Sequence, residues 1–252
     1  MGGAILNGLL GPDVKISGGI RATNRTESKA AALRVDGVES FAVETVRNAN
    51  LLAVAGAKIV LIGVKPFGVI DTLTEIAHAL EPDALVISVA AGVPTVRMEK
   101  VLQNSVLRAM PNTPAIVGRS VTGLSAGSRA TREDVALGRA LFETVGSVVE
   151  VPESQIDALS TISGSGPAYV FYLIEELTRA AVALGFSAAQ ARELVTGTFL
   201  GSVELLAASG TDPAELRRQV TSPNGTTERA IAVLETADLS GLFSRATAAA
   251  LA

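Results

Sequence analysis

The sequence contains no cysteine and no tryptophan, and it has one histidine among 252 residues. The absence of cysteine excludes disulfides, thiolate nucleophiles and cysteine-ligated metal sites. The single histidine, His78, lies in a predicted helix between Leu73 and Leu80, where a surface position is expected. A Ser-His-Asp hydrolase or a multi-histidine zinc site therefore cannot be built around it, and we expect no bound metal.

Basic clusters and long apolar runs are also lacking. The net charge is −4 and the isoelectric point is near 5.2, which provides no basic surface for nucleic acid. The longest charge-free apolar run, 84–96, contains Ser88, Gly92 and Pro94 and is too short to span a bilayer. The N-terminus has neither a basic leader nor a secretory apolar segment, so the sequence predicts a cytoplasmic protein without nucleic-acid or membrane partners.

Apolar residues are abundant, at 48% of the chain, and favour a buried parallel sheet or a large subunit interface. Up to about residue 151, short β-rich runs alternate with helical segments such as 27–35 and 71–80. This order predicts an α/β, Rossmann-like, doubly wound parallel sheet. The predicted strands are 19–24, 58–64, 85–89, 106–109, 121–126 and 145–151.

After Pro152 the strand signals stop and the pattern becomes helical. Pro167 suits the first turn of a helix that reaches about Leu184. Ser187 and Gln190 form a capping box for the next helix, which Gly210 is expected to end. The sequence therefore predicts a Rossmann-like domain over 1–152, followed by an all-helical C-terminal domain over 153–252.

Three loops after predicted strands are candidates for binding a dinucleotide, because such sheets bind it at the carboxyl ends of their strands. In the first, Arg25 with Asn24 and Thr26 is suited to a 2′-phosphate, which favours NADPH. A helix cap beside a solvated arginine explains this loop equally well. The other two loops contain small or turn-forming residues that let a nicotinamide or ribose approach, or that simply form turns: Val64, Lys65, Pro66, Ala90, Ala91 and Gly92.

The first residues, Met-Gly-Gly-Ala-Ile-Leu, look like the end of a glycine-rich loop entering its helix. The strand and the pyrophosphate-binding glycines that open a Rossmann fold are not in the sequence. If the protein begins at Met1, we expect weakened pyrophosphate binding and a sheet that lacks its central strand.

A second candidate site is the segment 220–227, which combines hydroxyls with a Pro-Asn-Gly turn before a helix predicted over 228–239. Pro223 and Gly225 are expected to fix an irregular backbone, with Gly225 tolerating positive φ. Thr226 or Thr227 is expected to cap the helix. Free backbone N–H groups beside hydroxyls suit a carboxylate, although ordinary turn chemistry is the alternative.

Two motifs are distinctive enough to indicate a protein family: Arg-Ala-Met-Pro-Asn-Thr-Pro at 108–114 and Ser-Gly-Ser-Gly-Pro-Ala-Tyr at 163–169. Together with the loops at 23–26, 63–66 and 220–227, they resemble the pyrroline-5-carboxylate reductase family over nearly the whole chain. The resemblance implies reduction of 1-pyrroline-5-carboxylate to L-proline with NADPH, or alternatively NADH, as the last step of proline biosynthesis. It also implies a homodimer formed through a substrate-binding helical domain, often assembled further into decamers.

The resemblance assigns a role to each matched position. The cofactor would contact the three loops, an asparagine of the first domain and the Met-Pro-Asn turn: Asn24, Arg25, Thr26, Asn50, Val64, Lys65, Pro66, Ala90, Ala91, Gly92, Met110, Pro111 and Asn112. The substrate would contact Ser222, Gly225, Thr226 and Thr227, with Thr227 as the catalytic group that hydrogen-bonds the ring nitrogen. A protonated imine is already electrophilic, so orientation supplies most of the help that its reduction needs.

One residue departs from the family pattern, because Asn224 stands where the family usually has glycine. Two other functions compete with this assignment. A related imine or β-hydroxyacid reductase is the first, but the hydroxyacid enzymes use a lysine in the first long helix of the second domain, and 165–184 contains none. A catalytically inactive, truncated oligomerising module of the same fold is the second.

Overall fold

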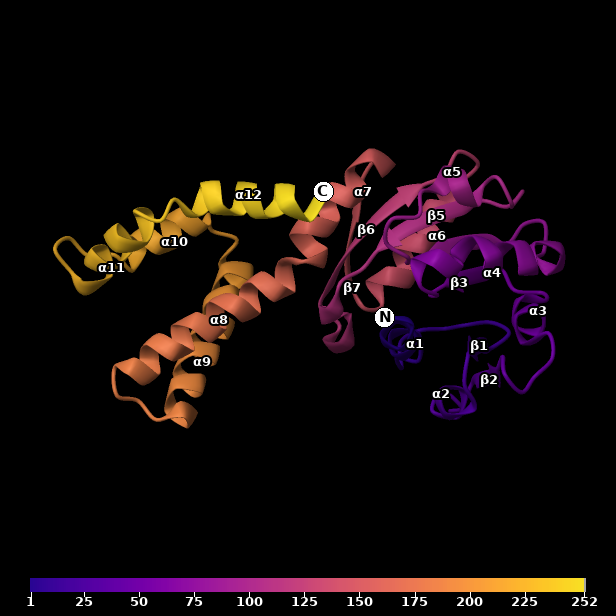
Figure 1. Cartoon of the computed structure of the whole chain (residues 1–252), viewed down its shortest axis with the longest axis horizontal. Coiled ribbons are helices and arrows are strands. Elements are labelled where there is room, and N and C mark those ends of the chain that lie inside the picture. Colours follow the sequence, from indigo (N-terminus) through magenta and orange to yellow (C-terminus); the bar gives the residue numbers. More distant parts are fainter. Residues whose placement is uncertain (252) are drawn as a thin grey trace. The chain divides into compact units, whose positions relative to one another are not determined.

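The computed structural model describes residues 1–251, which divide into two compact units (Figure 1). The first unit ends at Ser165 and the second begins at Gly166. The sequence places the boundary after residue 152. In the structure the residues that follow, η4 (Glu153–Gln155), α7 (Ile156–Leu159) and the π-helical turn η5 (Ser160–Gly164), pack on the sheet of the first unit. Ile156 has no exposed surface, and a Cβ on Gly123 of the sheet would lie 2.7 Å from the Leu159 side chain.

The first unit contains a Rossmann-like α/β fold with two sheets. In the smaller sheet, β1 (Ile20–Asn24) pairs in parallel with β2 (Val38–Ala42). The larger sheet has the order β3-β4-β5-β6-β7. Its strands are β3 (Ile59–Ile62), β4 (Leu85–Ser88), β5 (Val106–Met110), β6 (Ser120–Ala126) and β7 (Gly146–Glu150). All neighbours are parallel except β5 and β6, and no ladder joins β1 to β3 within residues 1–251.

The central strands of the larger sheet are buried on both faces, as their continuous apolar runs predict. On one face, Val86 and Val106 join a core with α3 (Ala49–Val54), α4 (Val69–Ile76) and α5 (Thr95–Met98). On the other face, Leu85 and Leu107 join a core with α1 (Gly2–Leu9) and α6 (Arg132–Glu143). This alternation follows from the two-residue repeat of a strand.

Several element boundaries differ from the sequence prediction. The helix predicted over 27–35 ends as α2 (Glu27–Ala31), and the one predicted over 71–80 is α4 followed by the 3₁₀ turn η2 (Ala77–Ala79). Strand β2 was not predicted, because Glu39 and Ser40 interrupt its apolar residues. In the structure Ser40 is buried and Glu39 is exposed, which is the alternation of a half-buried strand.

The second unit is helical, as predicted. It contains α8 (Gly166–Ala183), α9 (Ala188–Ser209), α10 (Pro213–Gln219), α11 (Thr226–Glu235) and α12 (Leu239–Leu251). Helices α8 and α9 pack side by side around Ala181, Ala191 and Val195 (Figure 1). The Ser187–Gln190 capping box is confirmed, and α9 ends at Gly210 with φ +61°.

Within residues 1–251, no single helix has the length and apolar composition needed to cross a membrane. Taken together, α9 and α10 meet that requirement, but the pair is bent by 116° at its break.

Candidate active site

The predicted cofactor-binding loops lie at the carboxyl ends of the parallel strands. In the larger sheet, Ile62 pairs with Ser88 and Ser88 pairs with Arg108, so the loops after β3 and β4 and the end of β5 are neighbours. In the smaller sheet, the loop after β1 likewise follows the carboxyl end of its strand. This edge is where open α/β sheets bind their ligands.

The loop after β1 presents a free positive charge. Arg25 is exposed, and its guanidinium has no hydrogen bond or ion pair within residues 1–251. Thr26 is the N-cap residue of α2, but its side chain makes no capping hydrogen bond. Instead, Glu44 Oε1 accepts a hydrogen bond from the backbone N–H of Glu27 at 2.7 Å. The side chain of Arg34 donates to Glu27 and lowers the pKa of that carboxyl.

The loops after β3 and β4 are open toward solvent. Lys65 is exposed and unpaired in the described chain, next to the turn η1 (Pro66–Gly68). Gly92 has φ +70°, and a Cβ built on it would meet no atom within 4 Å. Glycine is therefore favoured there by the backbone conformation, and the space in front of it is available to a ligand. Ala90 is buried, and its N–H donates to Ser88 Oγ at 3.3 Å.

Two asparagines that the resemblance assigns to the cofactor are engaged by the protein. Asn50 Nδ2 donates to Glu75 Oε2 at 2.9 Å. Asn112 is 8% exposed, and its Nδ2 donates to the Ser163 carbonyl oxygen at 2.9 Å. Asn112 Oδ1 accepts from Ser120 Oγ at 3.1 Å and from the Val121 N–H at 3.0 Å. The side chain of Asn112 thus joins the turn after β5 to β6 and to the π-helical turn η5.

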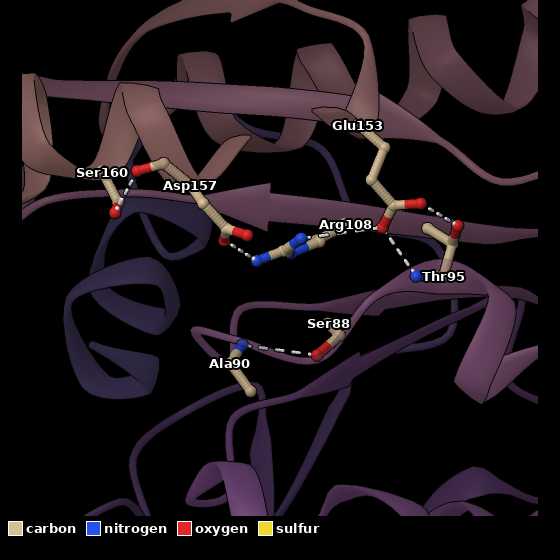
Figure 2. Close-up of polar contacts among 7 residues, drawn as sticks. All are labelled: Ser88, Ala90, Thr95, Arg108, Glu153, Asp157 and Ser160. Atoms are coloured by element: carbon tan, nitrogen blue, oxygen red, sulfur yellow. Dashed lines mark hydrogen bonds and ion pairs between the residues drawn. The ribbon is translucent and has the colours of Figure 1, made fainter. Parts of the chain in front are cut away.

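An ion-pair cluster around the buried Arg108, near the β4 loop, is not predicted from the sequence. Figure 2 shows Arg108 of β5 between Glu153 and Asp157, with Glu153 also bound to Thr95 at the start of α5. The sequence signal that could have indicated this cluster is Arg108 itself, a charged residue inside the apolar strand β5. Its partners are more than 40 residues away in sequence, which is why a local pattern could not find them.

In the second unit, the turn before α11 is built differently from the prediction. The residue with positive φ is Asn224, at 59°, whereas Gly225 has φ −78°. Asparagine is among the residues that tolerate the left-handed region, which explains how it replaces a glycine. Gly225 is needed for close packing instead, because a Cβ on it would lie 2.9 Å from the Ser222 carbonyl oxygen.

The predicted threonine caps are wrong. Helix α11 begins at Thr226 with Gly225 as its N-cap residue, makes no side-chain capping hydrogen bond, and ends at Glu235. In the turn before the helix, Glu228 Oε2 accepts from the Asn224 N–H at 2.7 Å. Ser222 and Thr226 are exposed, and Thr227 is half-buried in the first turn.

The positions of these groups fit a nicotinamide dinucleotide in the first unit. Arg25 and Lys65 offer free cations to phosphates, and Gly92 leaves space for a ring or a ribose. Among residues 1–251 no cluster of three or more His, Asp or Glu side chains is placed to bind a metal. A Rossmann-like unit of this kind followed by a helical unit defines a two-domain NAD(P)-dependent oxidoreductase.

Comparisons with known proteins specify the family. Residues 153–252 match the model for pyrroline-5-carboxylate reductase dimerisation, and residues 1–92 match the model for NADP oxidoreductase, coenzyme F420-dependent. The pyrroline-5-carboxylate reductase of Corynebacterium melassecola is 36% identical, over 98% of this chain and 91% of that protein. The corresponding protein of Pseudomonas aeruginosa is 38% identical, over 92% and 88%. The chain belongs to the pyrroline-5-carboxylate reductase family.

Solved structures agree with this assignment. The pyrroline-5-carboxylate reductase of Coxiella burnetii is 34% identical, with a TM-score of 0.90 over 99% of this chain and 92% of that one. The Plasmodium falciparum pyrroline carboxylate reductase, solved with NADP bound, is 24% identical with a TM-score of 0.77 over 92% and 95%, and shows the shared fold.

Replacing Asn112 with alanine tests the structural role of its amide. We expect Asn112→Ala to lower the free energy of unfolding by about 1–3 kcal/mol, because it leaves the part-buried Val121 N–H and Ser163 carbonyl without their partner. Urea denaturation measures the change. Asn7→Ala, at an exposed position of α1, is the matched control and should change stability by less than about 0.5 kcal/mol. Equal effects of the two substitutions would contradict the role.

Proposed function

We propose that the chain reduces 1-pyrroline-5-carboxylate to L-proline with NADPH, in the last step of proline biosynthesis. The observation that carries the proposal is the 36% identity to a pyrroline-5-carboxylate reductase over 98% of the chain. The geometry of the first unit supports it, because open loops and free cations lie at the carboxyl ends of the strands. The helix start at Thr226 supports it in the second unit.

When bound, NADPH supplies the hydride that reduces the imine carbon. In the first unit, the guanidinium of Arg25, with Asn24 and Thr26, would bind the 2′-phosphate of the adenosine half. The loops after β3 and β4 would receive the ribose and nicotinamide through Val64, Lys65, Pro66, Ala90, Ala91 and Gly92. Asn50 and the Met110-Pro111-Asn112 turn would complete this surface, with Asn112 acting through the turn that it stabilises.

In the second unit, the start of α11 would bind the substrate. The first turn of a helix has backbone N–H groups without intrahelical acceptors, and these favour an anion. Thr226 and Thr227 would present such groups to the carboxylate, with the Ser222 hydroxyl beside them. Gly225, whose own N–H donates to the Ser222 carbonyl oxygen at 3.0 Å, would let the substrate approach the backbone closely. The Thr227 hydroxyl would hydrogen-bond the ring nitrogen. As hydride adds to carbon, the electron pair of the C=N⁺ bond stays on nitrogen, which retains its proton and becomes the amine.

The direct test is turnover by the purified full chain. With 1-pyrroline-5-carboxylate we expect substrate-dependent oxidation of NADPH and formation of L-proline in equal amounts, followed by absorbance and by chromatography. NADPH should also raise the melting temperature, since a ligand of the native state must stabilise it. A chain that neither turns over nor is stabilised by NADPH would instead be the inactive oligomerising module.

Arg25→Ala tests the proposed phosphate contact. Loss of one charge-assisted contact should raise the KM for NADPH by about tenfold or more and change the KM for NADH little, because NADH has no 2′-phosphate. Initial rates with each cofactor measure this difference. Arg132→Ala, which removes another exposed arginine at the start of α6, is the control. Equal changes for the two cofactors would place Arg25 outside the phosphate site.

Thr227→Val tests the proposed catalytic hydroxyl. The substitution keeps the side-chain shape, so we expect correct folding and a fall in kcat/KM for the imine of about ten- to a hundredfold, with the KM for NADPH unchanged. Thr236→Val is the control, because that hydroxyl donates to the Val233 carbonyl oxygen at the far end of α11. Unchanged kcat/KM in Thr227→Val would transfer the role to another group.

We also propose that the helical unit forms a homodimer, with a decamer built from such dimers as the larger assembly. Apolar side chains remain exposed on the unit by itself, including Phe171 at 65%, Leu184 at 81% and Val233 at 69%. Such exposure is unusual for a monomer surface and typical of an interface. Light scattering should give a dimer or a multiple of it, and a monomer at micromolar concentration would contradict the proposal. The cytoplasmic location remains a prediction.

A further inference from the structure

A row of buried polar residues crosses the larger sheet just before its carboxyl edge. Ser88 of β4, Arg108 of β5 and Ser125 of β6 are register partners, so their side chains share one face. Their exposed fractions are 0%, 3% and 3%. Burying a guanidinium is unfavourable unless it is paired, so the partners of Arg108 determine how this face is covered.

Both acidic partners of Arg108 come from the segment that follows β7. Asp157 Oδ1 accepts from Arg108 Nη2 at 2.6 Å, and Glu153 Oε1 lies 3.7 Å from Nη1. Arg108 Nε is buried and has no partner within residues 1–251. The guanidinium is therefore oriented toward the two carboxylates, as Figure 2 shows, and it attaches the segment 153–157 to the centre of the sheet.

Glu153 extends this connection to the loop after β4. Its Oε1 accepts from the Thr95 N–H at 2.6 Å, and its Oε2 accepts from Thr95 Oγ1. Thr95 is buried and closes the loop that contains Ala90 and Gly92. At the opposite end of that loop, the Ser88 hydroxyl accepts from the Ala90 N–H. The loop is thus fixed at both ends by groups of the same buried face (Figure 2).

We propose that Glu153, itself oriented by Arg108, is a positioning residue for the loop 90–94 and thereby for the nicotinamide half of the cofactor. This inference rests on the proposed function, because it takes the loop to line the cofactor site. Glu153 does not touch the reacting atoms. It sets the conformation of the loop through Thr95, and Asp157, at 2.6 Å, is the closer ion-pair partner of Arg108.

Glu153→Ala is the main test, with Glu99→Ala as the matched control. Glu99 follows the opposite end of α5, and its carboxylate also binds a backbone N–H and a hydroxyl, those of Ser128 rather than of Thr95. In Glu153→Ala, Asp157 still pairs with Arg108, so the variant is expected to fold. We expect its Kd and KM for NADPH to rise by about tenfold, the scale of one lost charge-assisted hydrogen bond, while the KM for the imine changes by less than about twofold.

Two further readouts separate positioning from stability. Glu153→Gln retains an acceptor for the Thr95 N–H and should recover part of the NADPH affinity. Amide hydrogen exchange of 90–95 in the cofactor-free protein should accelerate in Glu153→Ala and not in Glu99→Ala. If Glu153→Ala is poorly folded, Thr95→Val, which removes only the hydroxyl donor, should produce the same exchange change.

The proposal is overturned if Glu153→Ala binds NADPH like the wild type, or if Glu99→Ala weakens NADPH binding equally. Failure of the proposed function would look different. In that case the wild type would not reduce the imine, whereas the exchange measurement would still show whether Glu153 fixes the loop.

Discussion

The parallel register of β3, β4 and β5 is the constraint on which the candidate site depends. Because Ile62, Ser88 and Arg108 lie side by side, the loops that follow these strands must emerge together at one edge. Apolar side chains on both faces of the strands fix this register, since a slip by one residue would exchange the buried faces. The open space at Gly92 and the exposed Lys65 are consequences of that arrangement.

A second set of interactions restrains the conformation of the loop after β4, which the strand register alone does not determine. Loops after parallel strands are intrinsically variable, and one of them is restrained here by ion pairs and hydrogen bonds around the buried Arg108. Only the guanidinium is buried in this network, since the Glu153 side chain is 27% exposed and that of Asp157 64%. Leaving a buried charge without its partners costs about 3–5 kcal/mol, whereas an exposed pair such as Arg179–Glu175 contributes about 1 kcal/mol or less. The contacts of Arg108 therefore restrain the candidate site more strongly than a fully exposed ion pair would.

Local chemistry in the sequence predicted much of the fold. The capping box at Ser187, the glycine end of α9 and the α/β pattern depend on residues close together in the chain, and all are found. The features that the sequence did not predict depend on residues far apart in the chain, or on which of two neighbouring residues takes a given position. Glu39 and Ser40 interrupt the apolar pattern of β2, Gly225 rather than a threonine is the N-cap residue of α11, and Asn224 rather than Gly225 has positive φ. The partners of Asn112 and Arg108 became visible only once the sheet was assembled.

The central claim is that the carboxyl edge of the parallel strands binds NADPH. Amide hydrogen exchange of the full chain, measured with and without saturating NADPH, tests it most directly. The account predicts protection concentrated in residues 23–26, 63–66 and 89–95, with the sheet behind them unchanged. Protection confined to other segments, or binding of NADPH without protection of these loops, would contradict it.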